Sequence, residues 1–159
     1  HKQGAWRGNR QRFPRIAALS NKWVQFANKH GYVETMPDKT VNPERGYPLL
    51  CTRTEWGKVL PTVPLNYHVQ GTAMWCTCKA MVRCKEQLGE WRRSGKHGCW
   101  IALQVHDEIV FDLPAAGKAN LPKVRKLQRL MEESGNDIGV PLKVSVSYHP
   151  NNWSERVVL

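Results

Sequence analysis

The sequence predicts an α+β domain in which long helices pack against an antiparallel sheet. Three observations favour this fold class: three segments carry apolar residues at helical spacing, two β-rich runs flank a polar bend, and a C-terminal segment alternates apolar and polar residues. With 159 residues, 41% of them hydrophobic, and seven tryptophans, the chain is long enough to form a core. We therefore expect residues 1–159 to form a single domain.

The N-terminal half predicts one helix, one short strand and a long irregular stretch. The helix is expected over residues 13–30, with Gly31 as its stop and with apolar residues Ile16, Leu19, Val24 and Phe26. Residues 31–36 predict a short strand. Residues 41–64 contain Pro43, Pro48, Pro61 and Pro64, which predicts loops and short extended pieces.

The C-terminal half predicts two helices and a final strand around a hairpin. The longest helix is expected over residues 70–93, with one apolar face formed by Ala73, Cys76, Ala80, Cys84, Leu88 and Trp91. Arg92, Arg93 and Lys96 suit its C-terminal end, where the helix dipole favours positive charge. A second helix is expected over residues 118–134, with Pro122 in its first turn and Gly135 just past its end. The alternation of Leu142, Val144, Val146 and Tyr148 predicts a half-buried strand over residues 140–148.

The bend of the expected hairpin breaks a local rule. Residues 103–114 read LQVHDEIVFDLP, so His106, Asp107 and Glu108 separate two runs that are typical of buried strands. Two-residue hairpin turns favour Asn-Gly, Asp-Gly or Gly-X, and none of these is present. Such a break is expected where function overrides folding convenience, which makes the tip a candidate site.

The chain is strongly basic. It carries 24 Lys and Arg against 13 Asp and Glu, a formal charge of +11 and a pI near 9.7. The first 33 residues contain seven Lys or Arg and no acid. A solvated basic face is the simpler interpretation, but the excess recurs along the chain, which favours contact with the phosphates of a polyanion.

Cysteine usage and hydropathy argue against three classes of protein: disulfide-rich, zinc-binding and membrane-spanning proteins. The five cysteines are odd in number and form no C-x-x-C pair, which argues against a disulfide framework and a zinc site, so we expect reduced packing residues. No apolar run approaches the roughly 20 residues that span a bilayer, and the start lacks a signal-peptide pattern. We expect a soluble protein in the cytoplasm of a bacterial or phage-infected cell.

Adjacent carboxylates on a tight bend repel each other, so nearby positive charge is needed to keep both ionised. Mg²⁺ prefers oxygen ligands and binds through one or two carboxylates together with substrate phosphates and water. Asp107 and Glu108 are therefore candidate Mg²⁺ ligands for phosphate chemistry. A solvated acidic turn remains the alternative on spacing alone.

Four collinear segments carry a resemblance to a known family. Gln104-Val105-His106-Asp107-Glu108 is similar to motif C of family A DNA polymerases, the bacterial DNA polymerase I group and its phage relatives. Residues 66–73, NYHVQGTA, resemble the N-x-x-x-Q-G-T-A that opens the long palm helix of that family. Residues 13–35 resemble its F-P-x-(helix)-G-Y-V-E-T segment, and residues 140–153 its V-P-L-x-V-x-V to N-W close. The matches span nearly the whole chain.

The resemblance implies a DNA-directed DNA polymerase, a nucleotidyltransferase with two-metal catalysis, and an antiparallel palm-type sheet that bears the motif C hairpin. Asp107 and Glu108 would be the catalytic, metal-binding pair, and His106 would approach the terminal nucleotide of the primer. Asn66 and Gln70, together with Gln104, would contact primer-template DNA, whose minor groove presents acceptors on every base pair. Gln70 is also expected at a helix N-terminus, where backbone N–H groups favour phosphate; ordinary helix capping is the alternative for Asn66 and Gln70.

The departures from the family pattern define what is missing. Motifs A and B, which carry the second Asp ligand and the nucleotide-gripping residues of the fingers, have no match and lie upstream in the family. The arginine-rich run after G-Y-V-E-T is replaced by MPDKTVNPERGYPLL, Thr62 stands where the family has Arg, and residues 147–150 replace a Gly-x-Gly. Residues 1–159 are thus expected to be the C-terminal palm portion with an adjoining fingers helix.

Three functions follow from these observations. The leading hypothesis is a split subunit or fragment of a DNA polymerase that needs primer-template DNA, deoxynucleoside triphosphates and an N-terminal polymerase segment that supplies motifs A and B. The alternative is a catalytically inactive, non-specific DNA-binding module derived from a polymerase. An HD-type phosphohydrolase is disfavoured, because its His-Asp pair lies on a helix whereas the flanks here predict strands.

Overall fold

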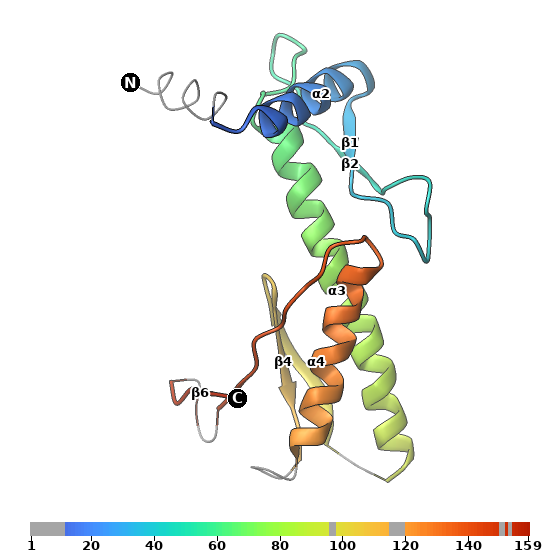
Figure 1. Ribbon diagram of the computed structural model, residues 1–159, viewed down its shortest axis with the longest axis vertical. Helices are drawn as coiled ribbons and strands as arrows, with labels where there is room; N and C mark the ends of the chain where they lie inside the picture. Colours follow the sequence, from blue (N-terminus) through green and yellow to red (C-terminus); the bar gives the residue numbers. More distant parts are fainter. Residues whose placement is uncertain (1–11, 96–97, 115–119, 150–151, 153) are drawn as a thin grey trace. The chain divides into compact units, whose positions relative to one another are not determined.

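The computed structural model describes residues 12–95, 98–114, 120–149, 152 and 154–159. The fold is α+β, as predicted, and its elements are labelled in Figure 1. The chain divides into two compact units, His1–Thr72 and Ala73–Leu159, here called the N-terminal unit and the C-terminal unit. The described strands form three separate two-stranded antiparallel sheets, so the single sheet that the sequence analysis predicted is not observed.

The first helix and strand of the N-terminal unit confirm the prediction. Helix α2 spans Pro14–His30, and Pro14 stands in its first turn, where a missing N–H costs nothing. Gly31 ends the helix with a φ of 83°, and its N–H donates to the carbonyl of Ala27. Strand β1 (Tyr32–Glu34) follows at once and pairs with β2 (Pro48–Leu50).

The core of the N-terminal unit forms where α2, the β1–β2 pair and the loop after β2 meet. Its fully buried residues are Ala27, Val33, Cys51 and Val59. Trp23 and Leu49 pack against this cluster, together with Val63 from the first turn of α3. The core therefore fixes the start of α3 relative to the rest of its unit.

Helix α3 spans Val63–Arg93 and so begins seven residues before the predicted start at residue 70. Pro64 was interpreted as part of a loop, but proline is compatible with the first turn of a helix because N–H groups there have no intrahelical acceptor. Along the C-terminal unit, Cys76, Ala80, Cys84 and Leu88 form the predicted buried face. Ala73 was also predicted on this face but is exposed.

The hairpin of the C-terminal unit consists of β3 (Trp100–Val105) and β4 (Glu108–Asp112), as predicted. It packs on α3 and on α4 (Leu121–Asn136) through a core of Cys84, Leu88, Cys99 and Leu127, and Figure 1 shows the hairpin alongside α4. The two strands of the hairpin are less buried than predicted: Leu103 is 51% exposed, and of their residues only Ile109 is buried. A two-stranded sheet buries one face, so alternate apolar residues remain open.

Helix α4 continues past its predicted end, because Gly135 lies inside the helix rather than after it. A Cβ at Gly135 would overlap the carbonyl oxygen of Val140 and lie 2.5 Å from Cγ of Leu142. The glycine therefore permits the returning chain to pack on the helix. The residue that turns the chain is Gly139, with a φ of 76°.

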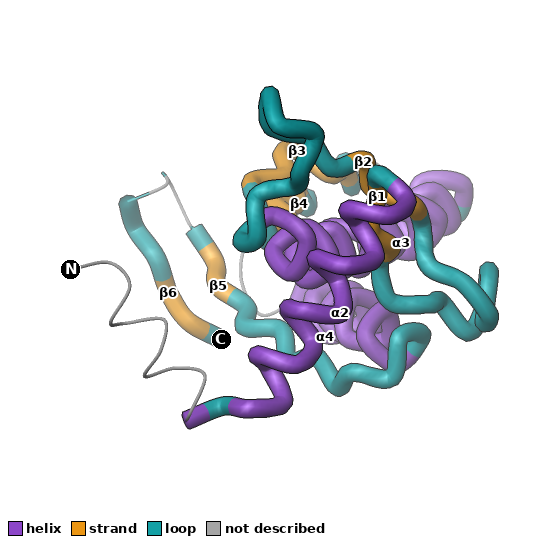
Figure 2. Tube along the Cα trace, turned by 90° about the horizontal axis from the view of Figure 1, so that it is seen from above, coloured by secondary structure: helices purple, strands orange, loops and turns teal. Residues whose placement is uncertain are grey.

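The strand predicted over residues 140–148 is mostly absent: only Ser147–Tyr148 (β5) is a strand, and it pairs with Val157–Val158 (β6). Figure 2 shows these two short strands side by side at the end of a loop. Gln128 Nε2 donates to the carbonyl of Val144 at 2.7 Å, and the N–H of Val144 donates to the carboxylate of Glu132 at 3.0 Å. Side chains of α4 therefore bond the backbone that a neighbouring strand would otherwise pair.

Four of the five cysteines are buried, in agreement with a packing role, and Cys78 is half-buried. Burial raises the pKa of the Cys84 thiol to about 12, so this thiol stays protonated at neutral pH. Among the described residues no helix has both the length and the apolar character that a bilayer crossing requires.

Candidate functional site

The tip of the β3–β4 hairpin is a two-residue turn. Val105 pairs with Glu108, which leaves His106 and Asp107 as the turn residues. His106 has a φ of 54° and is the only non-glycine residue with a positive φ in the described part of the chain. Primed hairpin turns require this backbone at their first central position, where glycine or asparagine is usual. The left-handed region costs an L-residue roughly 1–2 kcal/mol, so the tip holds a strained backbone of the kind found at functional sites.

The side chain of Gln104 stabilises this strained turn. Its Nε2 donates a hydrogen bond to the carbonyl oxygen of His106. Gln104 is half-buried, whereas the turn residues are exposed. The glutamine of the Q-V-H-D-E segment thus braces the backbone that orients His106 and Asp107, a contact that the sequence did not indicate.

Asp107 and Glu108 present their carboxylates to solvent. Both side chains are exposed, and neither makes a hydrogen bond or an ion pair with any residue that the structure describes. Two neighbouring carboxylates with free oxygen lone pairs fit the hard, oxygen-only preference of Mg²⁺. Over the same described residues there is no group of three or more His, Cys, Asp or Glu side chains arranged to hold a metal. The pair can therefore supply part of a metal site.

Asn66 and Gln70 lie on α3 in the N-terminal unit, on the same face because they are four residues apart. Both side chains are exposed, so two amide groups project in a similar direction. The expectation that Gln70 sits at a helix N-terminus is wrong, since α3 begins at Val63 and Gln70 is in its third turn. Free backbone N–H groups cannot assist phosphate binding at Gln70, which leaves its side-chain amide as the donor.

The Gly71-Thr72 pair that follows explains the local sequence. A Cβ at Gly71 would overlap Cδ1 of Leu49, so glycine permits β2 to approach the helix. Thr72 Oγ1 accepts the N–H of Met36 at 2.9 Å and donates to the carbonyl of His68 at 2.6 Å. These contacts attach α3 to the loop after β1 and hold Asn66 and Gln70 in place.

His68 is a residue that the sequence analysis missed. Its Nδ1 lies 2.5 Å from the carbonyl oxygen of Glu34, and because a carbonyl only accepts, Nδ1 carries the proton. Its ring centroid is 4.5 Å from that of Trp23. His68 lies between Asn66 and Gln70 in sequence but packs on the other side of the helix, so its role is to position α3.

The loop between β1 and β2 stands where the resemblance predicts an arginine-rich run, and hydrogen bonds within the loop hold it. Asp38 accepts hydrogen bonds from the N–H and hydroxyl of Thr40 at 2.8 and 2.7 Å. Arg45 forms an ion pair with Glu34 at 2.6 Å and donates to the hydroxyl of Tyr32. The charge of Arg45 is thereby partly compensated by Glu34 of β1.

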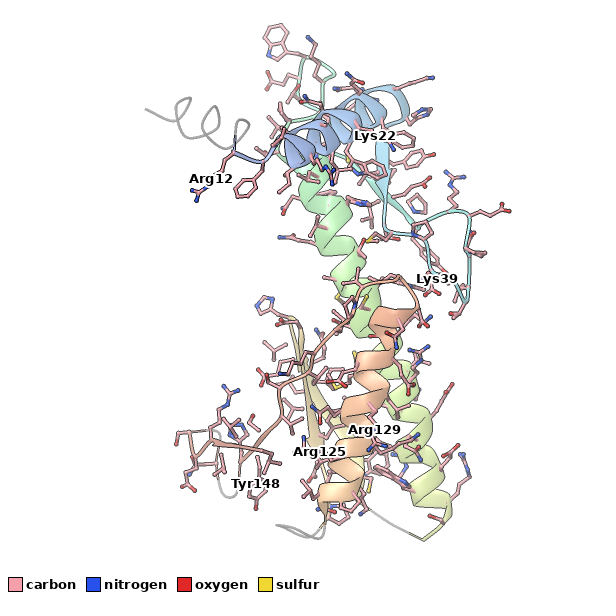
Figure 3. The ribbon with its side chains drawn as sticks, in the orientation of Figure 1. Arg12, Lys22, Lys39, Arg125, Arg129 and Tyr148 are labelled. Atoms are coloured by element: carbon pink, nitrogen blue, oxygen red, sulfur yellow. The ribbon has the colours of Figure 1, made fainter. Side chains whose placement is uncertain are left out.

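Exposed basic residues lie on two helices, one in each unit. Lys22 projects from α2, with Arg12 just before that helix, and Arg125 and Arg129 project from one face of α4 (Figure 3). Arg125 donates to Gln128 at 2.8 Å, a neutral partner that leaves the charge uncompensated. Of the seven basic residues in the first 33, Arg12, Arg15, Lys22 and Lys29 are exposed and available to a polyanion, and the other three lie outside the described residues.

The sequence is similar to DNA polymerases along almost its whole length. The profile of DNA polymerase family A matches residues 7–155. Thermostable DNA polymerase I of Thermus caldophilus is 32% identical over 137 residues, which cover 86% of this chain and 15% of that protein. The DNA polymerase of Mycobacterium phage D29 is 33% identical over 122 residues, which cover 76% of this chain and 16% of the phage protein.

The chain therefore belongs to DNA polymerase family A. It spans about 15% of the length of the curated relatives that it matches.

Proposed function

We propose that the chain is the C-terminal palm segment of a family A DNA polymerase and contributes motif C to template-directed DNA synthesis. The observation that carries this proposal is the strained hairpin tip, which presents two carboxylates without protein partners among the described residues. Strain at His106 and uncompensated charge at Asp107 and Glu108 both cost stability, and family membership supplies a functional reason to retain them.

Asp107 and Glu108 are the residues that would hold Mg²⁺. When bound, Mg²⁺ would supply Lewis-acid activation of an attacking hydroxyl and charge neutralisation at a transferred phosphate. The chain's own contribution is geometric: Gln104 fixes the carbonyl of His106, and the turn then orients the carboxylate of Asp107. His106, on the same exposed tip, would contact the end of a primer.

Asn66 and Gln70 would contact the minor groove of the primer-template duplex. Amide donors can bond the acceptors that every base pair presents there, so they test pairing geometry without reading sequence. Their common exposure on one face of α3 supports this role. In this proposal Gln104 lies next to the DNA, and its main role is to hold the turn through its hydrogen bond to His106.

The rest of the active site would come from a polypeptide that carries motifs A and B. No segment of the sequence resembles either motif. The substrates would be primer-template DNA and deoxynucleoside triphosphates, in the cytoplasm of a bacterial or phage-infected cell.

Primer extension tests this proposal. The chain is assayed alone and mixed with a polypeptide that carries motifs A and B of a family A polymerase, each with Mg²⁺. We expect extension only from the mixture, and Asp107→Asn should abolish it. Asp112→Asn is the matched control, because Asp112 is an exposed aspartate at the opposite end of β4. Extension by the chain alone, or equal activity of Asp107→Asn, would contradict the half-site.

The alternative function is a catalytically inactive DNA-binding module. The formal charge of +11 and the exposed basic residues of α2 and α4 favour this function. Binding of DNA through its phosphates needs positive charge and no catalytic carboxylates. In that case the mixture would bind primer-template without extending it, and Asp107→Asn would bind no worse than the unaltered chain.

A further inference from the structure

A single tryptophan projects from the loop after β2. Trp56 is 86% exposed, more than any other large hydrophobic side chain that the structure describes. It lies between Arg53 and Val59, which pair with each other as an isolated antiparallel bridge. An indole with this exposure leaves its aromatic face open, and base–aromatic stacking requires such a face.

Hydrogen bonds within the loop hold the turn that carries Trp56. The N–H of Thr54 donates to the carbonyl of Lys58 at 2.8 Å, and the N–H of Gly57 donates to the carbonyl of Thr54 at 2.8 Å. The hydroxyl of Thr54 also donates to Lys58 at 2.9 Å. Gly57 has a φ of 69°, which the turn requires and glycine permits.

The same loop is attached to the core of its unit through Asn28. Arg53 donates to the carbonyls of Asn28 and Gly57 at 2.8 and 2.7 Å. The side chain of Asn28 accepts the N–H of Val59 at 2.8 Å, and Val59 is buried. The loop that carries the indole is therefore held in place before binding, so little of its conformational entropy would be lost when a partner binds.

Basic residues lie in and beside the loop that carries this indole. Lys58 and Arg53 belong to the loop, and Lys29 follows the Asn28 that anchors it; all three side chains are exposed. The acceptors of Arg53 are carbonyls, so its charge is not neutralised by a carboxylate. Glu55 is the one acid of residues 53–59, which leaves the neighbourhood cationic.

We propose that Trp56 stacks on an unpaired base of single-stranded DNA while Lys58 and Arg53 contact the adjacent phosphates. An exposed aromatic face flanked by cations is the combination by which proteins hold single strands without reading their sequence. Tryptophan and arginine are also frequent in protein interfaces, but lysine is depleted there, so Lys58 beside the ring favours DNA as the partner. The inference rests on the proposed function, which requires that DNA be bound, and adds a contact to the unpaired part of a template.

The experiment measures fluorescence anisotropy of a labelled oligothymidylate and of a labelled blunt duplex, each of about 20 nucleotides per strand, with the 159-residue chain. Trp56→Leu removes the aromatic ring, and Trp56→Phe keeps a smaller one. Trp100→Leu is the matched control, because Trp100 is a second partly exposed tryptophan (53%) in the other unit. Circular dichroism confirms that each variant is folded.

Trp56→Leu should weaken binding of the single strand by about five-fold or more, and Trp56→Phe by less than about three-fold, because stacking depends on the ring. The affinity of Trp56→Leu and Trp56→Phe for the duplex should change by less than about two-fold. The affinity of Trp100→Leu for the single strand should also change by less than about two-fold. Equal single-strand affinity of Trp56→Leu and the unaltered chain would overturn stacking and assign the loop to a protein interface. That result would leave the proposed function intact, whereas failure of the unaltered chain to bind either DNA would count against both.

Discussion

At the scale of single residues, Asp107 is expected to limit stability while serving function. Without metal, its carboxylate adjoins that of Glu108 and has no compensating partner among the described residues. Asp107→Asn removes the repulsion at nearly constant size, so the melting temperature without Mg²⁺ should stay the same or rise. If Asp107 instead anchored the turn through charge-assisted hydrogen bonds, the same change would cost roughly 1–3 kcal/mol. Thermal melts followed by circular dichroism separate the two outcomes.

His106 offers a second test of the tip. Its φ of 54° is favourable for glycine and unfavourable for histidine, so His106→Gly should stabilise the folded chain by up to about 1 kcal/mol after the greater freedom of glycine in the unfolded state is included. Urea unfolding measures the gain. His106→Ala is the control, because alanine retains the Cβ and should give no gain. A loss of stability in His106→Gly would mean that the imidazole holds the turn.

The sequence identified the tip but not its construction. The break in turn chemistry at His106 and Asp107 was visible because hairpin turns have strict residue preferences. The hydrogen bond from Gln104 to His106 was not, because a glutamine in a strand reads only as a polar residue. The exposure of Trp56 could not be predicted from the sequence, because a single aromatic residue in a loop can be either buried or exposed.

At the scale of elements, two helical glycines of the C-terminal unit should respond oppositely to alanine. Gly135→Ala places a Cβ against the backbone oxygen of Val140, so we expect a loss of about 1–3 kcal/mol. Gly89→Ala meets only Arg93 Nη1 at 3.4 Å and Arg92 Nη2 at 3.9 Å, the ends of flexible side chains. It should gain about 0.5–1 kcal/mol from helix propensity.

Urea unfolding of both variants, followed by far-ultraviolet circular dichroism, measures the difference. A gain in Gly135→Ala would show that residues 140–142 do not pack on α4 in solution. Loss in both variants would indicate that helix propensity does not govern either position.

The errors in the predicted elements have local physical causes. Helix α3 was predicted to start too late because Pro64 is both a loop signal and a good first-turn residue, and only tertiary packing decides between them. The strand over residues 140–148 was predicted from alternation alone. Its backbone pairs with side chains of α4 instead, because residues 128 and 132 present an amide and a carboxylate one helical turn apart.

At the scale of the whole molecule, charge is unevenly shared between the units. His1–Thr72 contains eleven Lys and Arg against four Asp and Glu, whereas Ala73–Leu159 contains thirteen against nine. The N-terminal unit also bears Asn66, Gln70 and Trp56, three of the residues proposed to contact DNA. Electrostatic attraction to phosphates should therefore arise chiefly from this unit.

DNA binding by the whole chain should accordingly be non-specific and strongly salt-dependent. If about six phosphates are neutralised, log K falls against log salt with a slope of about −5, because bound counterions are released. Affinity should then drop roughly a thousand-fold between about 50 and 200 mM salt. Fluorescence anisotropy with two duplexes of the same base composition and different base order measures both the specificity and the salt dependence of binding.

The double variant Arg12→Gln, Lys22→Gln should reduce the slope by about two, whereas the double variant Arg125→Gln, Arg129→Gln should leave it nearly unchanged. A flat salt response would refute electrostatic binding. A slope that depends on α4 rather than α2 would place the DNA on the C-terminal unit, away from Asn66 and Gln70.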